Sequence, residues 1–196
     1  MKVSAAAHLR HRPVPCFLED TMIKTYHTLT FAAMCLALSI VLPFLTGQIP
    51  EIGQMLSPMH IPALLCGFIC GPLWGCAVGA GAPLLRSVLF GMPPFPMVAV
   101  PMAFELAAYG LIAGLFYKLL PKKIRYIYVS LICAMLCGRI VWGIVKVIMS
   151  IAQASNFTFA AFITGAITGS IPGIICHIIL VPLIVIALKR AKLIQD

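Results

Sequence analysis

Acidic residues are scarce in this chain. Only five of its 196 residues are Asp or Glu, and the two Asp residues stand near its ends. The sequence contains no H-E-x-x-H, no G-x-x-x-x-G-K-[ST], and no visible paired-aspartate or serine–histidine arrangement. These absences exclude a zinc peptidase and an ATPase that works alone, and they disfavour an intramembrane enzyme. We therefore expect no catalytic residue and no cofactor.

A C-x-x-C pair is also absent, although the chain has eight cysteines. Cys66 and Cys70 are four residues apart, as are Cys133 and Cys137, and each pair lies within an apolar run. Helical cysteines at this spacing could ligate a soft metal, but small residues on membrane helices are the simpler explanation. We expect no metal site, and free thiols suit a cytoplasmic membrane.

Long polar stretches are lacking too, and apolar residues make up 62% of the chain against 10% charged residues. No segment could build a separate soluble core, so we expect a single membrane domain at 25–190. It is preceded by a disordered polar tail at 1–24, which lacks the apolar run of a secretory signal. A cytoplasmic tail at 191–196 follows it.

The hydrophobic segments predict an all-α integral membrane protein with six transmembrane helices. The second and third segments are short and meet at Gly71-Pro72, so one kinked helix, giving five spans, is the alternative. Basic residues at both ends of the chain and in the loop 118–125 favour six, because the positive-inside rule then places all three in the cytoplasm. The same rule explains the net charge of +9 without a nucleic-acid partner. The segments span about 29–45, 59–70, 73–90, 97–117, 126–151 and 158–188.

Two cations interrupt the fifth segment. Arg139 and Lys146 are seven residues apart, so they share a helix face, and Trp142 lies between them on that face. A cation at the middle of a membrane costs about 2.5–3.5 kcal/mol on insertion scales. Counter-charges, water or an anionic ligand must therefore surround this face.

Other segments carry polar groups at similar depth. Glu105, Arg86, His60 and Asn156 are expected in the outer half of the membrane or at its outer mouth, where they could line one cavity with Arg139 and Lys146. This balance of charge favours a small carboxylate as ligand, beside an apolar wall that includes Trp142, Phe104, Tyr109 and Met102.

Simpler explanations compete at several of these positions. Glu105 is explained equally well as a structural partner of Arg139 or Arg86, and His60 as a helix cap. Arg86 and Lys146 could extend to the membrane interface. His177 is expected in the inner half of the sixth segment, away from the other polar groups, as a packing residue.

Three classes of function are compatible with these sequence features to different degrees. A membrane-embedded binding protein that hands a solute to a partner explains the outward polar groups, the loop 46–58 as a lid, and the absence of an energy source. A self-sufficient secondary transporter is the alternative, but no internal repeat is found. An intramembrane enzyme is the weakest of the three.

Several stretches of the chain resemble the substrate-binding (S) components of energy-coupling factor vitamin transporters. The size and the six segments are similar over residues 25–190, and AMCLA at 33–37 looks like the family's Ala-x-x-x-Ala motif. The resemblance implies that Ala33 and Ala37 dock on a transmembrane coupling (T) subunit. The similar stretches are FAAMCLALSIVLP at 31–43, SPMHIPALLCGFICGPLWGCAVG at 57–79 and LLRSVLFGMPPFP at 84–96.

The resemblance also implies two cytoplasmic ATPase subunits, a bacterial plasma membrane, and a vitamin or precursor bound near the outer face. The S component would topple in the membrane to release its cargo inside. The stretch MHIPALLCGFICGP looks like the branch with pantothenate and pyridoxine- or pyrimidine-type proteins. We favour a pantothenate-like ligand, whose carboxylate suits Arg139 and whose hydroxyls suit His60 or Asn156.

Overall fold

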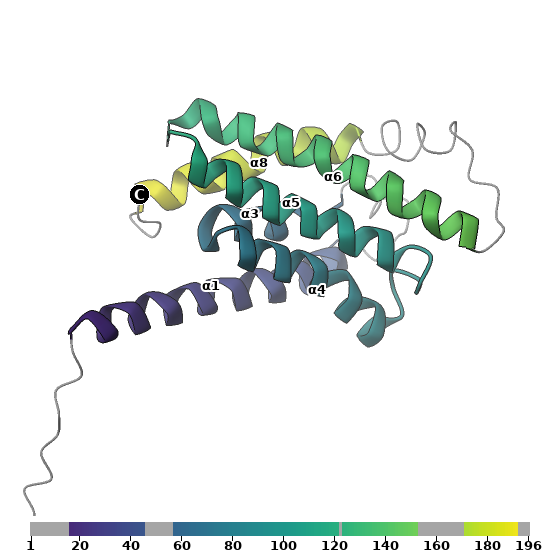
Figure 1. Cartoon of the computed structure of the whole chain (residues 1–196), viewed down its shortest axis with the longest axis horizontal. Coiled ribbons are helices and arrows are strands. Elements are labelled where there is room, and N and C mark those ends of the chain that lie inside the picture. The colour runs from purple at the N-terminus through teal and green to yellow at the C-terminus, as the bar shows by residue number, and fades with distance from the viewer. Residues whose placement is uncertain (1–15, 46–56, 122, 153–170, 192–196) are drawn as a thin grey trace, which may run out of the picture.

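The computed structural model describes residues 16–45, 57–121, 123–152 and 171–191, and these form helices and no strand. The predicted all-α fold is therefore confirmed for this part of the chain. Figure 1 shows the helices packed roughly along a common direction, with the first half of α1 extending away from the bundle. The helices are α1 (Cys16–Leu45), α3 (His60–Cys70), α4 (Pro72–Phe90), α5 (Ala99–Leu119), α6 (Ile124–Ala152) and α8 (Ile171–Arg190).

The chain reverses between α3 and α4 at Gly71. This residue has φ +90°, a conformation that glycine adopts without steric cost, and Pro72 then starts the next helix. A Cβ added at Gly75 would lie 2.7 Å from the Cα of Gly67, whereas residues eight apart in one straight helix are about 12 Å apart. The two short segments therefore form a helical hairpin and not one kinked helix.

Helix α5 lies against this hairpin at van der Waals distance. Gly110 of α5 faces the backbone of both Gly67 and Gly75, and Gly114 faces Gly67 and Pro72. A side chain at any of these glycines would collide with backbone atoms, so the small residues allow three helices to approach closely. Helix α6 covers another side of α5 (Figure 1).

Successive helices run in alternating directions. The first residues of α1, the α3–α4 turn, the connection from α5 to α6 and the last turn of α8 all lie toward one end of the bundle, on the left in Figure 1. The connection from α4 to α5 and the end of α6 lie toward the other end. Basic residues of the first end include Arg125 and Arg190, which suits the charge pattern that predicted the topology.

Five of these helices are long and apolar enough to cross a membrane: Thr25–Phe44 within α1, α4, α5, α6 and Pro172–Arg190 within α8. Helix α3 has 11 residues and a length of about 16 Å, which is shorter than the hydrocarbon core. The six predicted spans thus correspond to five full-length helices and one short helix.

The start of the first helix differs from that expected. Helix α1 begins at Cys16, so its first two turns lie in the segment expected to be a polar tail. Helix α8 spans Ile171–Arg190, and the part of the sixth segment expected from about 158 to 170 cannot be compared with it because it is not among the described residues. The stretch 153–170 lies outside the described residues, as does the proposed lid at 46–56.

Candidate functional site

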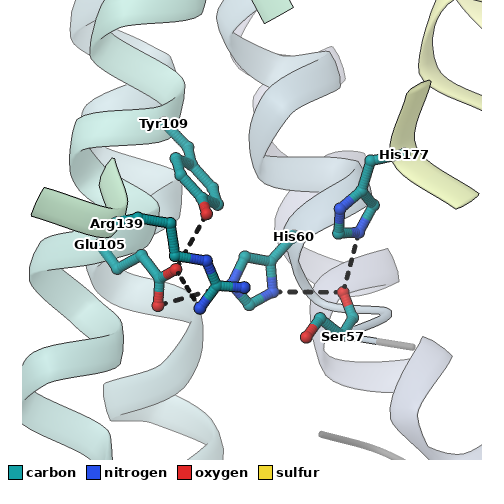
Figure 2. Close-up of polar contacts among 6 residues, drawn as sticks. All are labelled: Ser57, His60, Glu105, Tyr109, Arg139 and His177. Carbon is teal, nitrogen blue, oxygen red and sulfur yellow. Dashed lines mark hydrogen bonds and ion pairs between the residues drawn. The ribbon is translucent and has the colours of Figure 1, made fainter. Parts of the chain in front are cut away.

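A buried carboxylate on α5 is the centre of a polar cluster inside the bundle. Glu105 is 2% exposed, and its Oε1 lies 3.0 Å from Arg139 Nη1 of α6. The same oxygen accepts a hydrogen bond of 2.9 Å from the hydroxyl of Tyr109, which follows Glu105 by one turn of α5 and so shares its face. Opposite charges are therefore paired at the interface of α5 and α6 (Figure 2).

Gly138 makes this arrangement possible. The ring of Tyr109 lies directly on the α6 backbone at Gly138, where an added Cβ would overlap ring atoms Cε1 and Cδ1. Gly138, against which the Tyr109 ring packs, is the residue directly before Arg139, which supplies the cation. Glu105 thus accepts a hydrogen bond from Tyr109 and forms a salt bridge with Arg139.

Two histidines extend the cluster toward α3 and α8. Nε2 of His60 lies 3.8 Å from Glu105 Oε2, and Nδ1 of His60 lies 3.2 Å from the carbonyl oxygen of Ser57. That carbonyl oxygen also lies 3.3 Å from Nε2 of His177 on α8. The two imidazole rings stack with centroids 5.7 Å apart. Figure 2 shows the resulting chain of contacts from α5 through α3 to α8.

Ser57 holds an uncommon backbone conformation at this point. Its φ of +43° lies in the left-handed region, which is disfavoured for a residue with a Cβ. In this conformation its carbonyl oxygen accepts the backbone N–H of His60 at 3.0 Å and faces both imidazole rings. The start of α3 is thereby attached to α8.

The cluster lies toward one end of the bundle. His60 is the first residue of α3, and Glu105 and His177 each lie six residues beyond the first residue of their helix, a depth of about 9 Å. These helices all start from the end opposite the basic residues, which the charge rule assigns to the outside. Arg139 reaches the same level from α6, which runs in the other direction.

The structure brings together Arg139, Glu105 and His60, as the sequence predicted. Trp142 is partly buried, one turn beyond Arg139 on α6, and Lys146 lies a further turn along, where its Nζ donates to the carbonyl oxygen of Met97 at 2.9 Å. Asn156 lies outside the described residues.

Arg86 does not join the cluster. It points toward α1, where Nη1 donates to the carbonyl oxygen of Ile40 at 2.6 Å and the guanidinium lies over the rings of Phe44 and Phe90. Arg86 thus joins α4 to the end of α1, and the expectation that it lines the same cavity is not met.

The prediction for His177 was wrong, because the residue lies beside His60 and not away from the other polar groups. Counting helix rise from about 158 placed His177 too far inward, whereas its ring stacks on that of His60 at the start of α3. Tyr109 was expected as apolar wall but donates to Glu105, and Phe104 is exposed on the outer surface of the bundle.

Comparison with protein families decides what this membrane domain is. The profile of the ECF transporter substrate-specific component matches residues 27–185, which is most of the chain. The chain belongs to this family. The resemblance seen in the sequence is thus confirmed, and this substrate-specific component is a multi-pass integral membrane protein of a transport system.

Searches of curated proteins and of solved structures found no match. Membership of the family implies association with T and ATPase subunits in general. The family is one of substrate-binding transport components and not of enzymes. The ligand must therefore be inferred from the residues of the cluster.

Proposed function

We propose that this S component captures a water-soluble vitamin or vitamin precursor at the outer face of a bacterial plasma membrane. A T subunit and two cytoplasmic ATPases then drive its release inside. The buried cluster around Glu105 is the observation that carries the proposal. Packing of apolar helices needs no such group, and ionisable residues inside a membrane generally mark a site of function.

A pantothenate-like ligand is the first candidate. Such a molecule has hydroxyls and an amide at one end and a carboxylate at the other, so it requires polar partners at two separated places. The cluster supplies one of them. Lys146 supplies the other, because it lies seven residues from Arg139 on the same face of α6, about 10 Å along the helix.

A pyridoxine- or pyrimidine-like ligand is the second candidate, and the pairing of Arg139 with Glu105 favours it. The carboxylate already balances the charge of the deepest cation. A neutral ring with hydroxyl or amino substituents could then bind beside the histidines without a charge of its own. Both candidates remain vitamins or vitamin precursors, as the proposal requires.

The docking surface that we propose for the T subunit is the outer face of α1. Ala33 and Ala37 are exposed one turn apart, whereas Ala32, Cys35 and Ser39 of the same helix face inward. Two small exposed side chains on one helix face allow close approach of a partner helix. Membrane lipid would cover the rest of this apolar surface.

Mass spectrometry of small molecules that co-purify with the protein tests the proposed function directly. We expect a vitamin or precursor in an amount comparable to the protein, lost when the protein is denatured and dialysed. Uptake by the purified chain alone in liposomes would instead identify a self-sufficient secondary transporter. If no solute co-purifies and none of the candidate ligands binds, the proposal is wrong.

A further inference from the structure

The protonation of His60 is constrained by the groups on its two sides. Its Nδ1 faces the carbonyl oxygen of Ser57, which can only accept a hydrogen bond, so Nδ1 carries the proton in a neutral ring. Nε2 then has a lone pair. This atom is buried, has no hydrogen-bond partner among the described residues, and faces Glu105 Oε2, a second acceptor, at 3.8 Å.

Neighbouring atoms of the cluster also have capacity for hydrogen bonds. Glu105 accepts from both Tyr109 and Arg139 through Oε1, so Oε2 is the oxygen that faces His60. Nε of Arg139 is buried and has no hydrogen-bond partner in the described part of the chain. With the His60 ring neutral, two facing acceptors and a nearby donor are thus arranged around one place between α3, α5 and α6.

We propose that the ligand is recognised here by a neutral group that presents a hydrogen-bond donor next to an acceptor. The donor, a hydroxyl or N–H, meets His60 Nε2 and Glu105 Oε2, and the acceptor meets Arg139. This inference rests on the proposed function and specifies which part of the ligand contacts the cluster. Hydroxy-amides, aminopyrimidines and hydroxymethylpyridines all carry such a pair of groups.

A carboxylate fits this place poorly. It would approach a carboxylate of like charge and the lone pair of His60, and the charge of Arg139 is already paired at 3.0 Å. For a pantothenate-like ligand the hydroxy-amide end therefore enters the cluster. Its carboxylate points outward along α6, toward Lys146, which is the reverse of the orientation expected from the sequence.

Two matched pairs of probes test this reading by titration calorimetry on the purified, folded chain. Pantothenate and pantothenol differ in a carboxylate against a hydroxymethyl group at the outer end, and 4-pyridoxate and pyridoxine differ in the same way on a ring. The comparison is made in Lys146→Ala, which removes the cation proposed to hold the carboxylate, so that the remaining difference reports on the cluster. In the pair that binds, we expect the neutral member to bind this variant within about tenfold of the acid or more tightly. A neutral member that still binds the variant more than about tenfold more weakly than its acid would overturn the inference.

Two substitutions of His60 separate recognition of ligand from attachment of the loop. His60→Asn keeps a donor near the position of Nδ1, which faces Ser57, and removes the group at Nε2. His60→Gln places an amide near Nε2 and gives up the Ser57 contact. We expect the neutral probe to lose at least about tenfold in affinity with His60→Asn and less than about threefold with His60→Gln. The opposite order would show that His60 serves only to hold Ser57, and would overturn the inference.

The outcomes distinguish this inference from the proposed function. Tight binding of the acid members alone, in Lys146→Ala as well as in the wild type, is compatible with a vitamin-binding S component and refutes recognition of a neutral group by the cluster. If neither pair binds, the inference fails for these ligands, whereas the presence of a co-purifying vitamin still decides the proposed function. Glu105→Gln is a further check, because it keeps the shape of the side chain and should weaken the neutral probe by at least about tenfold.

Discussion

Arg139 and Glu105 illustrate how a membrane interior constrains single residues. Each charge alone would be costly at this depth, and together they form a close pair with Tyr109 as a third partner. A buried pair of this kind is weak evidence for stability, because desolvation offsets much of the attraction. Its value to the protein is better explained by the atoms that it positions, which are Arg139 Nε, without a hydrogen-bond partner among the described residues, and Glu105 Oε2, which faces His60.

Substitution of Arg139 by Ala should weaken binding of the natural solute at least tenfold. Loss of a charge-assisted hydrogen bond of about 2 kcal/mol corresponds to roughly thirtyfold in affinity. Arg139→Lys should restore little, because a single ammonium cannot reproduce both the contact with Glu105 and the donor at Nε. Calorimetric titration of the wild type and both variants measures the effect.

A double variant provides the control for folding. Arg139→Ala leaves the Glu105 carboxylate buried without its cation, which costs about 3–5 kcal/mol, so its melting temperature should fall. Arg139→Ala combined with Glu105→Gln removes both charges and should recover most of that stability but not the binding. Wild-type affinity in the double variant would show that the pair is purely structural.

Gly138→Ala should damage the site without changing any polar group. The new methyl group would overlap the ring of Tyr109, and overpacking of this kind costs about 1–3 kcal/mol. The displaced ring would no longer place its hydroxyl on Glu105, so ligand affinity and thermal stability should both fall. Gly81→Ala on α4 is the matched control, because a methyl group there meets no atom within 4 Å. Equal effects of the two substitutions would contradict the role given to Gly138.

The sequence was sufficient to predict some residues of the site and not others. Isolated charges inside apolar segments identified Arg139 and Glu105, because their cost in a membrane is independent of the fold. The fold decides which helix face meets which, so Arg86 was grouped with Arg139 although it contacts α1. Gly138 offered no signal, since its importance depends on a tyrosine ring from another helix.

At the scale of elements, the α3–α4 hairpin shows where hydropathy stops being informative. Gly67, Gly71, Gly75 and Gly79 recur at every fourth residue, a spacing typical of a packing stripe on one helix. The structure uses Gly67, Gly75 and Gly79 for contacts with α5. Gly71, however, turns the chain instead of packing it. Hydropathy is similar on both sides of this residue, so only charge parity indicated a reversal.

Substitution of Ala33 or Ala37 by Trp should abolish vitamin uptake and leave solute binding almost unchanged. Both residues are exposed on α1, and a bulky side chain would hold a partner helix away from the backbone. Uptake into cells that express the complete transporter and calorimetric binding by the isolated chain give the two readings. Ile132→Trp, at an exposed position of α6, is the control and should affect neither. Parallel loss of binding and uptake would mean that the alanines serve internal packing.

For the whole molecule, the positions of the helix ends relate the topology to the site. Helices α3, α5 and α8 start from the same end of the bundle, and each contributes a residue of the cluster within its first two turns. The sequence predicted this convergence for His60 and Glu105, because basic residues indicate the cytoplasmic end and these two residues lie toward the other end, but it did not predict it for His177. If the orientation in the membrane were reversed, the cluster would face the cytoplasm and could not capture an external solute.

Single-cysteine labelling in intact cells tests that orientation. In a variant without the eight native cysteines, Phe95→Cys places a thiol in the exposed connection between α4 and α5, and Lys123→Cys places one in the exposed connection between α5 and α6. These two connections lie at opposite ends of α5, so a membrane-impermeant maleimide should label position 95 in intact cells and position 123 only after permeabilisation. Retained solute binding by each variant shows that the thiols report on the folded protein. Labelling of position 123 in intact cells with position 95 protected would place the Glu105 cluster on the cytoplasmic side, and capture of a vitamin from outside would then be impossible by the route proposed.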